Sequence, residues 1–404
     1  MKILVIGSGG REHALCWKLA QSQGIEVYAC PGNPGMAREG TCVPGDPLDA
    51  ALRVGADLTV VGPEVPLVAG VVDAFRARGL RIVGPNAEAA RLEGSKIFAK
   101  DFFVQRGIPT AAYATAEDAS HARMVLGRFG FPVVLKADGL AAGKGVVVAH
   151  NAAEAEAALA TLKGRLVIEE FLTGEEVSFI ALSDGRDALP LAATQDHKAV
   201  FDGDLGPNTG GMGAYCDAGI LSDRVTQMVM DRVIYPTVEA MNFTGFLYAG
   251  LMITADGPKV LEFNVRLGDP ETQPLMHRME SDFVPALIAA SEGRLAGQKL
   301  AWNAGPSVCV VLASAGYPGA YEAGKEIRGL QMAEALGVTV FQAGTKMAHG
   351  RLETSGGRVL GVTASGADLP AAIAAAYDGV RHIEFDGMHF RHDIGSKGLV
   401  RSLR

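Results

Sequence analysis

The sequence predicts a multidomain α/β protein with a doubly wound parallel sheet at its N-terminus. The chain has 404 residues, which suffices for two to four domains at roughly 100–200 residues each. Hydrophobic residues make up 48% and charged residues 20%, an ordinary globular balance that excludes bulk disorder. Over the first hundred residues, short apolar runs alternate with helical stretches, which is typical of a parallel sheet covered by helices.

Three units are predicted along the chain. The first covers 1–99, with strands expected at 2–6, 26–29, 58–61 and 81–83 and a helix at 11–20. The second covers 100–295 and is expected to be mixed or antiparallel, with strands at 133–137, 146–149, 165–170 and 177–183, helices at 152–162 and 223–241, and a hairpin of 246–254 with 259–266. The third, 296–404, is a small α/β unit with strands at 308–313, 338–342 and 358–363 and a helix at 368–378.

Composition limits the function classes and the compartment. The net charge of −8, with no basic block, argues against a protein that binds nucleic acid or a membrane surface. Five widely spaced cysteines without a C-x-x-C pair favour a reducing compartment over a disulfide framework or zinc site. The N-terminal apolar run stops at Gly7, and no apolar run approaches the ~20 residues needed to span a bilayer, so we expect a cytoplasmic protein.

A glycine-rich loop follows the first predicted strand and opens the first helix. Residues 7–13 read GSGGREH, and the free N–H groups of a helix N-terminus suit an anion. A dinucleotide fingerprint would require a third glycine at Glu12 and an acidic residue at the end of the second strand, and both are missing. The loop therefore favours a small phosphate ligand over NAD, and a tight turn without a ligand stays open.

A second glycine-rich segment, 136–145, links two predicted strands and reads KADGLAAGKG. It departs from a Walker A loop because its glycines are one residue too close together and no helix follows. A glycine-rich hairpin with a lysine at each end can still fold over a triphosphate, since glycine lets the backbone approach and lysine supplies positive charge. A surface hairpin with solvated lysines is the alternative.

A third segment, 261–266, carries polar residues on one face of a strand. Alternation places Glu262, Asn264 and Arg266 on one face, about 6.5–7 Å apart, with Leu261 and the other apolar residues packed on the opposite face. Carboxylate and amide oxygens suit Mg²⁺, and arginine suits phosphate or carboxylate. A solvated hairpin face remains an equal alternative on this motif alone.

A fourth region combines charged residues with a turn-rich stretch. Asp196, His197 and Lys198 form a cluster that could bind a zwitterion, and 206–214 reads GPNTGGMGA, whose small residues let the backbone line a tight pocket. A flexible surface loop is the alternative.

Taken together and in this order, these segments resemble the phosphoribosylamine–glycine ligases, also called glycinamide ribonucleotide synthetases, of the ATP-grasp superfamily. The resemblance covers nearly the whole chain, and GPNTGGMGAY at 206–215 with RLGDPETQ at 266–273 is its most specific part. The other matching stretches are 5–13, 61–64, 92–96, 136–146, 168–172, 195–198 and 245–250.

The resemblance implies an ATP-grasp fold with an N-terminal domain, a lid at about 115–185, a central domain and a C-terminal domain. It implies an ATP site made by Lys100, Lys136, Gly143, Lys144, Gly145, Glu169, Glu170, Phe171, Leu172 and Glu176. It implies Glu262 and Asn264 as ligands of Mg²⁺ or Mn²⁺, and Arg266 and Lys136 as catalytic residues. It implies a substrate site made by Gly9, Gly10, Arg11, Glu64, Asp196, Lys198, Asn208, Gly210, Gly211, Met212, Arg266, Asp269 and Glu271.

The implied activity is ATP-dependent ligation of glycine to 5-phosphoribosylamine, a step of purine biosynthesis, by a monomer. Glycine's carboxylate would attack the γ-phosphorus of ATP, and the amine would then attack the resulting glycyl phosphate. Two like unit charges about 4 Å apart repel by about 4 kcal/mol at an effective dielectric near 20, so the site needs Mg²⁺ and cations. No serine or cysteine nucleophile is required.

Three features depart from the family pattern. Ala199 stands where the family usually has arginine, Leu267 stands where it often has phenylalanine, and the lid is shorter than usual. Another ATP-grasp ligase or carboxylase and a non-catalytic binding protein are the competing functions. The latter is disfavoured because Lys136, Glu262, Asn264 and Arg266 are all present.

Overall fold

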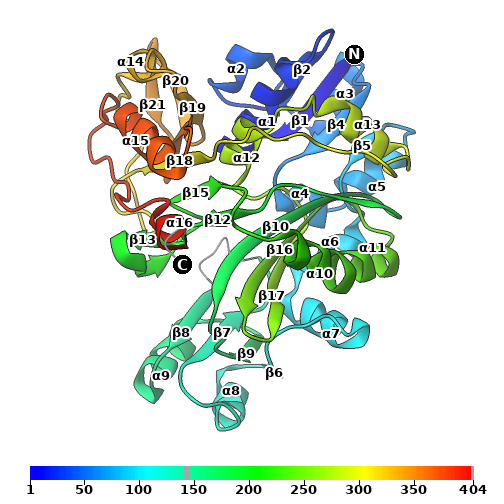
Figure 1. The fold of residues 1–404 in the computed structure, drawn as a ribbon, viewed down its shortest axis with the longest axis vertical. Coiled ribbons are helices and arrows are strands. Elements are labelled where there is room, and N and C mark those ends of the chain that lie inside the picture. Colours follow the sequence, from blue (N-terminus) through cyan, green and yellow to red (C-terminus); the bar gives the residue numbers. More distant parts are fainter. Residues whose placement is uncertain (141–144, 402–404) are drawn as a thin grey trace.

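The N-terminal part of the computed structural model is a five-stranded parallel sheet in the order β3-β2-β1-β4-β5 (Figure 1). The structure describes residues 1–140 and 145–401. The central strand reads KILVIG, and its apolar residues are all buried because helices cover both faces of the sheet. The strands are β1 (Lys2–Gly7), β2 (Glu26–Pro31), β3 (Thr41–Cys42), β4 (Leu58–Val61) and β5 (Ile82–Val83). The helices are α1 (Gly10–Ala20), α2 (Met36–Glu39), α3 (Pro47–Val54), α4 (Glu64–Val68) and α5 (Val71–Arg76).

A separate antiparallel sheet of four strands, in the order β6-β9-β7-β8, lies at the far end of the molecule in Figure 1. Helices α8 (Ala119–Leu126) and α9 (Ala152–Thr161) pack on it around its own apolar core. Its strands are β6 (Tyr113–Ala116), β7 (Val133–Ala137), β8 (Val146–Ala149) and β9 (Leu166–Glu170), and helices α6 (Ala87–Gly94) and α7 (Lys96–Arg106) lead into it. The predicted lid extended to residue 185, whereas β10 (Glu175–Asp184) pairs along its whole length with a strand of the large sheet.

The large sheet has nine strands and runs in the order β17-β16-β10-β12-β15-β18-β22-β19, with β11 paired to β10. It crosses the predicted boundary at 295/296, because β15 pairs with β18. Besides β10, its strands are β11 (Ala188–Pro190), β12 (Thr194–Asp196), β15 (Gly213–Cys216), β16 (Thr244–Thr254), β17 (Gly257–Asn264), β18 (Ser307–Ala313), β19 (Thr339–Gln342) and β22 (Arg358–Ser365). Two small hairpins are added by β13 (Ala199–Phe201) with β14 (Leu205–Asn208) and by β20 (Thr345–Ala348) with β21 (Arg351–Thr354).

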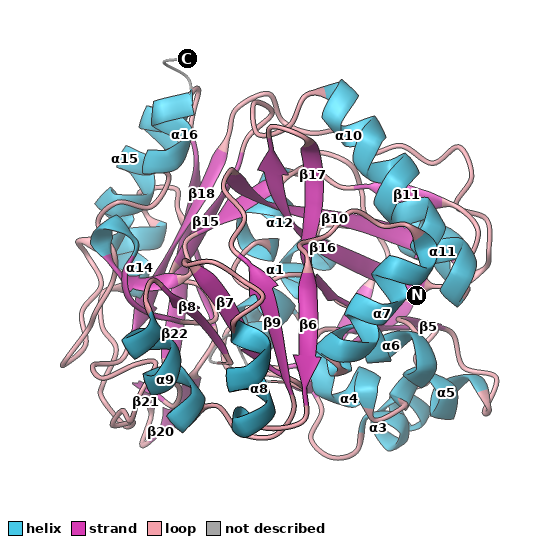
Figure 2. Ribbon diagram, turned by 90° about the horizontal axis from the view of Figure 1, so that it is seen from below, coloured by secondary structure: helices cyan, strands magenta, loops and turns pink. Residues whose placement is uncertain are grey.

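Helices cover the large sheet (Figure 2), and one of them, Val284–Ser291, contacts both this sheet and β5 of the N-terminal sheet. They are α10 (Asp223–Val229), α11 (Tyr235–Met241), α12 (Thr272–Arg278), α13 (Val284–Ser291), α14 (Leu330–Glu334), α15 (Leu369–Val380) and α16 (Ser396–Arg401). The single helix predicted at 223–241 contains a π-helical turn, Met230–Ile234. Pro236 follows this turn and has no N–H to continue the α-helical ladder, which accounts for the irregular turn. Within 1–140 and 145–401, no helix combines the length and apolar character needed to cross a membrane.

Candidate active site

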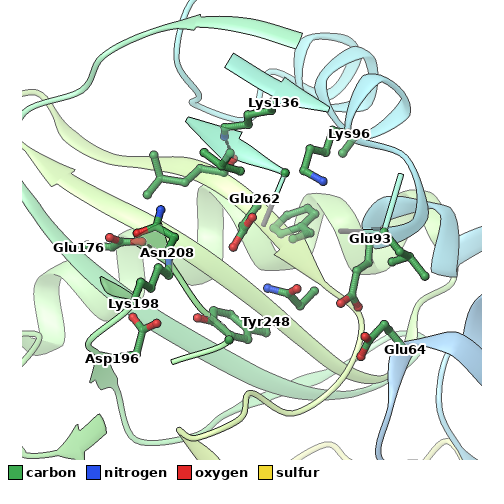
Figure 3. A pocket seen from close by; sticks show the side chains of 18 of the residues that line it. Glu64, Glu93, Lys96, Lys136, Glu176, Asp196, Lys198, Asn208, Tyr248 and Glu262 are labelled. Atoms are coloured by element: carbon green, nitrogen blue, oxygen red, sulfur yellow. Dashed lines mark hydrogen bonds and ion pairs between the residues drawn. The ribbon is translucent and has the colours of Figure 1, made fainter. Parts of the chain in front are cut away.

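A cavity of about 560 Å³ is lined by residues of the N-terminal part, the four-stranded sheet and the large sheet (Figure 3). Nineteen of the predicted site residues line it together: Arg11, Glu64, Lys100, Lys136, Gly145, Glu169, Glu170, Phe171, Leu172, Glu176, Asp196, Lys198, Asn208, Gly210, Glu262, Asn264, Arg266, Asp269 and Glu271. Residues from widely separated stretches of the sequence therefore line the same cavity.

Four predicted residues of the described chain are not among those that line the cavity: Gly9, Gly10, Gly211 and Met212. The side chain of Met212 is instead fully buried and packs in a small apolar cluster with Val200 and Ala313. Gly143 and Lys144 lie outside the described residues.

The glycine loop after β1 holds the protein's own carboxylate. The N–H of Gly9 donates to Oε2 of Glu12 at 2.6 Å, so the N–H predicted to be free for an anion is already used. A Cβ at Gly62 would lie 2.0 Å from Oε1 of Glu12, so glycine is required there to make room for this carboxylate. Glu12 also pairs with the Arg11 side chain, whose Nη1 donates to the carbonyl of Leu267 at 3.0 Å. The loop and its contacts therefore position the Arg11 side chain at the cavity.

Two predicted phosphate-binding lysines share one buried counter-ion. Glu169 lies 3.0 Å from the Nζ of Lys100 and 3.0 Å from the Nζ of Lys136, and all three side chains are buried. Burial lowers the pKa of Lys100 to about 8, although Glu169 acts in the opposite direction. Sequence reasoning assigned Glu169 only to an adenine-binding segment, because nothing in the local sequence reveals which cations its side chain meets.

A β-bulge at Leu261 changes the predicted alternation of β17. Gly250 is opposite Glu262 and Leu251 is opposite Val260, so Leu261 is the extra residue. Its carbonyl accepts a hydrogen bond from Lys136 Nζ at 2.9 Å, and Leu261 lines the cavity. The prediction that Leu261 packs on the opposite face is therefore wrong, because the bulge shifts it.

The polar face of β17 is present as predicted, and glutamates of the N-terminal part hold its arginine. Arg266 Nε lies 3.2 Å from Glu64 and Nη2 lies 3.0 Å from Glu93. Arg266 Nη2 also donates to Asn264 Oδ1 at 3.2 Å. Burial would lower the pKa of the guanidinium, but Glu93 and Glu64 raise it above its usual value, so Arg266 stays charged. Glu93, on α6, was missed because it is 173 positions before Arg266 in the chain.

Glu262 and Asn264 fit a partial site for a divalent cation. Burial raises the pKa of Glu262, but Lys198 and Lys136 outweigh this effect and lower it, so the carboxylate is ionised at neutral pH. Among residues 1–140 and 145–401, no group of three or more His, Cys, Asp or Glu side chains is arranged to hold a metal. The two protein oxygens suit Mg²⁺ that takes its other ligands from phosphates and water, as is common at phosphoryl-transfer sites.

The side chains of the predicted Asp-His-Lys cluster do not all point the same way. The cluster lies at the end of β12 and in the segment after it, and its middle residue faces away from the other two. Asp196 and Lys198 line the cavity, and Lys198 forms an ion pair with Glu176. His197 is fully buried on the other side, where its Nε2 lies 3.4 Å from the N of Gly395. Burial, with Lys397 and Arg391, lowers the pKa of His197 to about 3. Strand alternation explains the separation.

The C-terminal part adds two cavity residues that the sequence did not reveal. Arg358 Nη1 donates to the carbonyls of Gly210 and Asp269, both at 2.6 Å, and its Nη2 donates to Asp269 Oδ2 at 2.9 Å. Tyr317 Oη accepts a hydrogen bond from the Gly210 N–H at 3.1 Å. Arg358 was missed because no local motif surrounds it.

Comparisons with known proteins agree with this geometry. Three domains of one family match: phosphoribosylglycinamide synthetase N domain over 1–93, ATP-grasp (A) domain over 94–272 and C domain over 307–397. Phosphoribosylamine–glycine ligase of Pseudomonas aeruginosa is 52% identical over 426 aligned positions, covering 99% of both chains. The crystal structure of phosphoribosylamine–glycine ligase from Thermotoga maritima has a TM-score of 0.85 and 35% identity, covering 97% of this chain and 100% of that chain.

A more distant neighbour shares the fold. The biotin carboxylase domain of Hydrogenobacter thermophilus 2-oxoglutarate carboxylase has a TM-score of 0.71 at 17% identity, with 96% of this chain and 91% of that chain covered. The matches confirm the predicted family and the mixed α/β, ATP-grasp fold. This chain is a member of the phosphoribosylglycinamide synthetase family, the phosphoribosylamine–glycine ligases.

Proposed function

We propose that the cavity brings together ATP, glycine and 5-phosphoribosylamine and joins the latter two through glycyl phosphate. The observation that carries the proposal is the convergence of Lys100, Lys136 and Arg266 on the same cavity as the acidic and amide oxygens of Glu262 and Asn264. Such a site attracts a polyphosphate and stabilises the charge of a phosphoryl transfer.

ATP is proposed to lie between the four-stranded sheet and the large sheet. Lys100 and Lys136 face its phosphates, the segment 169–172 holds adenine and Glu176 faces the ribose. Glu169 keeps both lysines oriented through its ion pairs of 3.0 Å. Gly143, Lys144 and Gly145 complete the proposed phosphate-binding hairpin.

Glu262 and Asn264 are proposed to hold Mg²⁺ or Mn²⁺. When bound, this cation neutralises phosphate charge and orients the γ-phosphoryl group. The chain's own contribution is a carboxylate that stays ionised and an amide oxygen that Arg266 keeps in place at 3.2 Å.

The reaction is proposed to run in two steps. A carboxylate oxygen of glycine attacks the γ-phosphorus while the bond to ADP breaks, which gives glycyl phosphate. The nitrogen of 5-phosphoribosylamine then attacks the acyl carbon, the carbon–oxygen bond to phosphate breaks, and the amine loses a proton. Arg266 stabilises the transferred phosphoryl group and the acyl phosphate, and Lys136 assists at the phosphates.

The remaining predicted residues are proposed to bind the two acceptor substrates. Those that line the cavity are Arg11, Glu64, Asp196, Lys198, Asn208, Gly210, Arg266, Asp269 and Glu271. Gly9, Gly10, Gly211 and Met212 do not line it and are proposed to act by shaping the loops that carry these residues. We also propose that the chain divides along its sequence into three units, 1–99, 100–295 and 296–404, of which the last two share the large sheet. The chain is proposed to work as a cytoplasmic monomer without a nucleic-acid or membrane partner.

Phosphate release tests the proposed reaction. Purified protein with ATP, Mg²⁺, glycine and freshly generated 5-phosphoribosylamine should release phosphate and form glycinamide ribonucleotide, detected by mass spectrometry. Omission of either acceptor, or replacement of glycine by bicarbonate or another amino acid, should reduce the rate to background. Turnover with bicarbonate instead of glycine would favour an ATP-grasp carboxylase and contradict the proposal.

A metal titration tests the role of Glu262. Glu262→Gln keeps the side-chain shape but removes the charge, so we expect the Mg²⁺ concentration for half-maximal activity to rise about 10-fold or more. Removal of Mg²⁺ with a chelator should abolish the activity of both proteins. Glu156→Gln, which changes an exposed glutamate outside the cavity, is the matched control. An unchanged titration for Glu262→Gln would exclude it as a metal ligand.

A further inference from the structure

The hairpin β13–β14 borders the cavity but stands outside the large sheet. Lys198 precedes β13 and Asn208 ends β14, and both line the cavity. The two strands pair with each other in a sheet of their own, and an irregularity interrupts their register. Residues 201–207, which form most of the hairpin, are all exposed. Burial of apolar surface therefore contributes little to holding this hairpin in place.

The turn of this hairpin is not fixed by its own sequence either. Gly203 and Asp204 both have left-handed backbone conformations, with φ angles of 68° and 57°. Aspartate adopts this conformation at a cost, which other contacts in the fold must offset. The hairpin therefore needs partners from elsewhere in the chain.

A segment near the C-terminus, 389–397, supplies these partners, and we call it the C-terminal clamp. Its central residue is Arg391, which is fully buried. Arg391 Nη1 donates to the carbonyl of Ala199 at 3.0 Å and to Asp204 Oδ1 at 2.9 Å. Lys397 Nζ lies 3.0 Å from the other carboxylate oxygen of Asp204. In Figure 1, β13 accordingly lies beside α16, which carries this lysine.

Other residues of the clamp bind the same hairpin. The two oxygens of Asp393 accept from Nε and Nη2 of Arg391, both at 2.7 Å, and Oδ2 also accepts from the N–H of Gly203 at 2.8 Å. The remaining contacts join the His392 N–H to Asp202 Oδ1 at 2.7 Å and His389 Nε2 to the carbonyl oxygen of Val200 at 3.0 Å. The clamp therefore holds the hairpin from its first strand to its turn.

The carboxylates of this network are kept charged. Burial raises the pKa of Asp204, but Arg391 and Lys397 outweigh this effect and lower it below its usual value. Burial likewise raises the pKa of Asp393, whereas Arg391 and the Gly203 N–H bring it down to about 2. Both carboxylates are ionised at neutral pH and make charge-assisted hydrogen bonds with the guanidinium.

The clamp holds Lys198 through both of its neighbours in the chain. On one side, His197 Nε2 accepts a hydrogen bond from the N–H of Gly395 at 3.4 Å. On the other side, Arg391 binds the carbonyl of Ala199. No residue of the clamp, which lies wholly within the described chain, lines the cavity. The clamp can therefore affect the cavity only through the residues that it holds.

We propose that the C-terminal clamp positions Lys198 and Asn208 for the acceptor substrates, with Arg391 as the positioning residue at its centre. This inference rests on the proposed function, which assigns both cavity residues to the acceptors. A displacement of about 1 Å in groups that orient a substrate can lower the rate about 100-fold. The proposed ATP contacts lie on other elements, so the acceptors depend on the clamp more than ATP does.

The hairpin side of the clamp allows a test that preserves the fold. Arg391→Ala would leave Asp393 without its partner and destabilise the protein in general, so Asp202→Ala/Asp204→Asn is used instead. Both replaced side chains are about half exposed, and neither residue lines the cavity. The amide at position 204 can accept from only one of the two cations, because its NH₂ group faces the other.

Steady-state kinetics of this variant should separate the acceptors from ATP. We expect the KM for glycine, for 5-phosphoribosylamine or for both to rise about 5- to 20-fold, while the KM for ATP changes less than about 2-fold. The melting temperature should stay within about 2 °C of the wild type, since partly exposed ion pairs contribute little to the free energy of unfolding.

Amide hydrogen exchange provides a local measurement of the same effect. The amides of 205–210 should exchange about 5-fold faster or more in the variant, because this segment opens more often when the clamp is weakened. The amides of β16 and β18 should keep their wild-type rates.

Asp378→Asn/Asp386→Ala is the matched control. It also removes two exposed carboxylates from ion pairs of the C-terminal part, those with Arg381 and Lys325, and neither residue lines the cavity. The KM values for both acceptors and the exchange of 205–210 should remain at their wild-type values.

Unchanged KM values for both acceptors, an equal rise in the KM for ATP, or unchanged exchange of 205–210 would each overturn the proposal. If circular dichroism shows that the double variant does not fold, Lys397→Ala takes its place with the same expectations, since it removes one of the two cations that bind Asp204. The wild-type assay separates the two claims. Failure of the wild type to use glycine contradicts the proposed function, whereas a normal wild type with an unaltered variant contradicts only the role of the clamp.

Discussion

Arg266 joins three elements that meet at the cavity. It follows β17 and contacts Glu64 on α4 and Glu93 on α6. Burial raises the pKa of Glu93, and Arg266 opposes that rise, so the guanidinium also stabilises this part of the fold.

Arg266→Ala should lower kcat about 100- to 1000-fold with less than about a 3-fold change in the KM for ATP, because the side chain is proposed to act on the transferred phosphoryl group. The melting temperature should also fall, since Glu93 loses its partner. Arg123→Ala, which removes an exposed ion pair with Glu156, is the control and should change neither quantity. Near-normal turnover of Arg266→Ala would remove its assigned role.

The lowered pKa of Lys100 predicts that ATP use by the enzyme declines at alkaline pH. Because the pKa is lowered to about 8, Lys100 loses its proton as pH rises through this value, and kcat/KM for ATP should then decline severalfold between pH 7 and 9. Lys136, Glu169 and Glu170 are the charged groups that act on it. Lys100→Arg keeps its charge throughout this range and should abolish the decline. A variant that retains the decline would show that another group titrates.

Some residue-scale features could be predicted and others could not. The side-by-side placement of Glu262, Asn264 and Arg266 follows from strand period, and the cavity contains all three. The same rule could have separated His197 from its neighbours. Glu93 and Arg358 had no such signal, because their partners are far away in the sequence.

At the scale of elements, β22 connects the C-terminal part to the substrate segments. Arg358, its first residue, holds the carbonyls of Gly210 and Asp269 and the Asp269 carboxylate. Burial would lower the pKa of the Arg358 guanidinium, but Asp269 and Tyr317 raise it, so it remains a permanent cation. The strand therefore fixes two loops that belong to different parts of the chain.

Arg358→Ala should lower kcat/KM for glycine and 5-phosphoribosylamine about 10- to 100-fold, because both loops lose their anchor, while the KM for ATP stays within about 2-fold. Arg351→Ala, in the exposed hairpin β20–β21, is the control and should behave as wild type. Equal losses for ATP and for the acceptors would instead indicate a general loss of structure.

Element positions were predicted well where the apolar pattern is local. The hairpin β16–β17 and the helix α9 lie within a few residues of their predicted ranges. The bulge at Leu261 and the π-helical turn before Pro236 were not predicted, because register and helix winding depend on the neighbouring strand and on one missing N–H.

At the scale of the whole molecule, the large sheet unites the predicted central and C-terminal units, and the four-stranded sheet stands apart. β15 and β18 join across the predicted boundary, whereas the four-stranded sheet has its own core. These features imply different degrees of independence in unfolding.

Amide hydrogen exchange should reveal this difference. Strands β15 and β18 should exchange together and slowly, whereas β6 to β9 should exchange about 10-fold faster or more through separate opening. ATP with Mg²⁺ should slow exchange in β7 and β9, which carry Lys136 and Glu169, and should leave β18 unchanged. Exchange of all these strands at one common rate would contradict the separate opening of the small sheet.

The sequence by itself determined the family, the helices and strands that have a clear apolar pattern, and about half of the residues that line the cavity, since these depend on local pattern and on motifs. The tertiary structure alone decided which charges meet. Glu12 accepts the Gly9 N–H, Glu169 pairs with two lysines, and Arg266 pairs with Glu64 and Glu93. The physical reason is that a buried charge is stabilised by whatever group the fold brings within a few ångströms, and that group can come from any point of the chain.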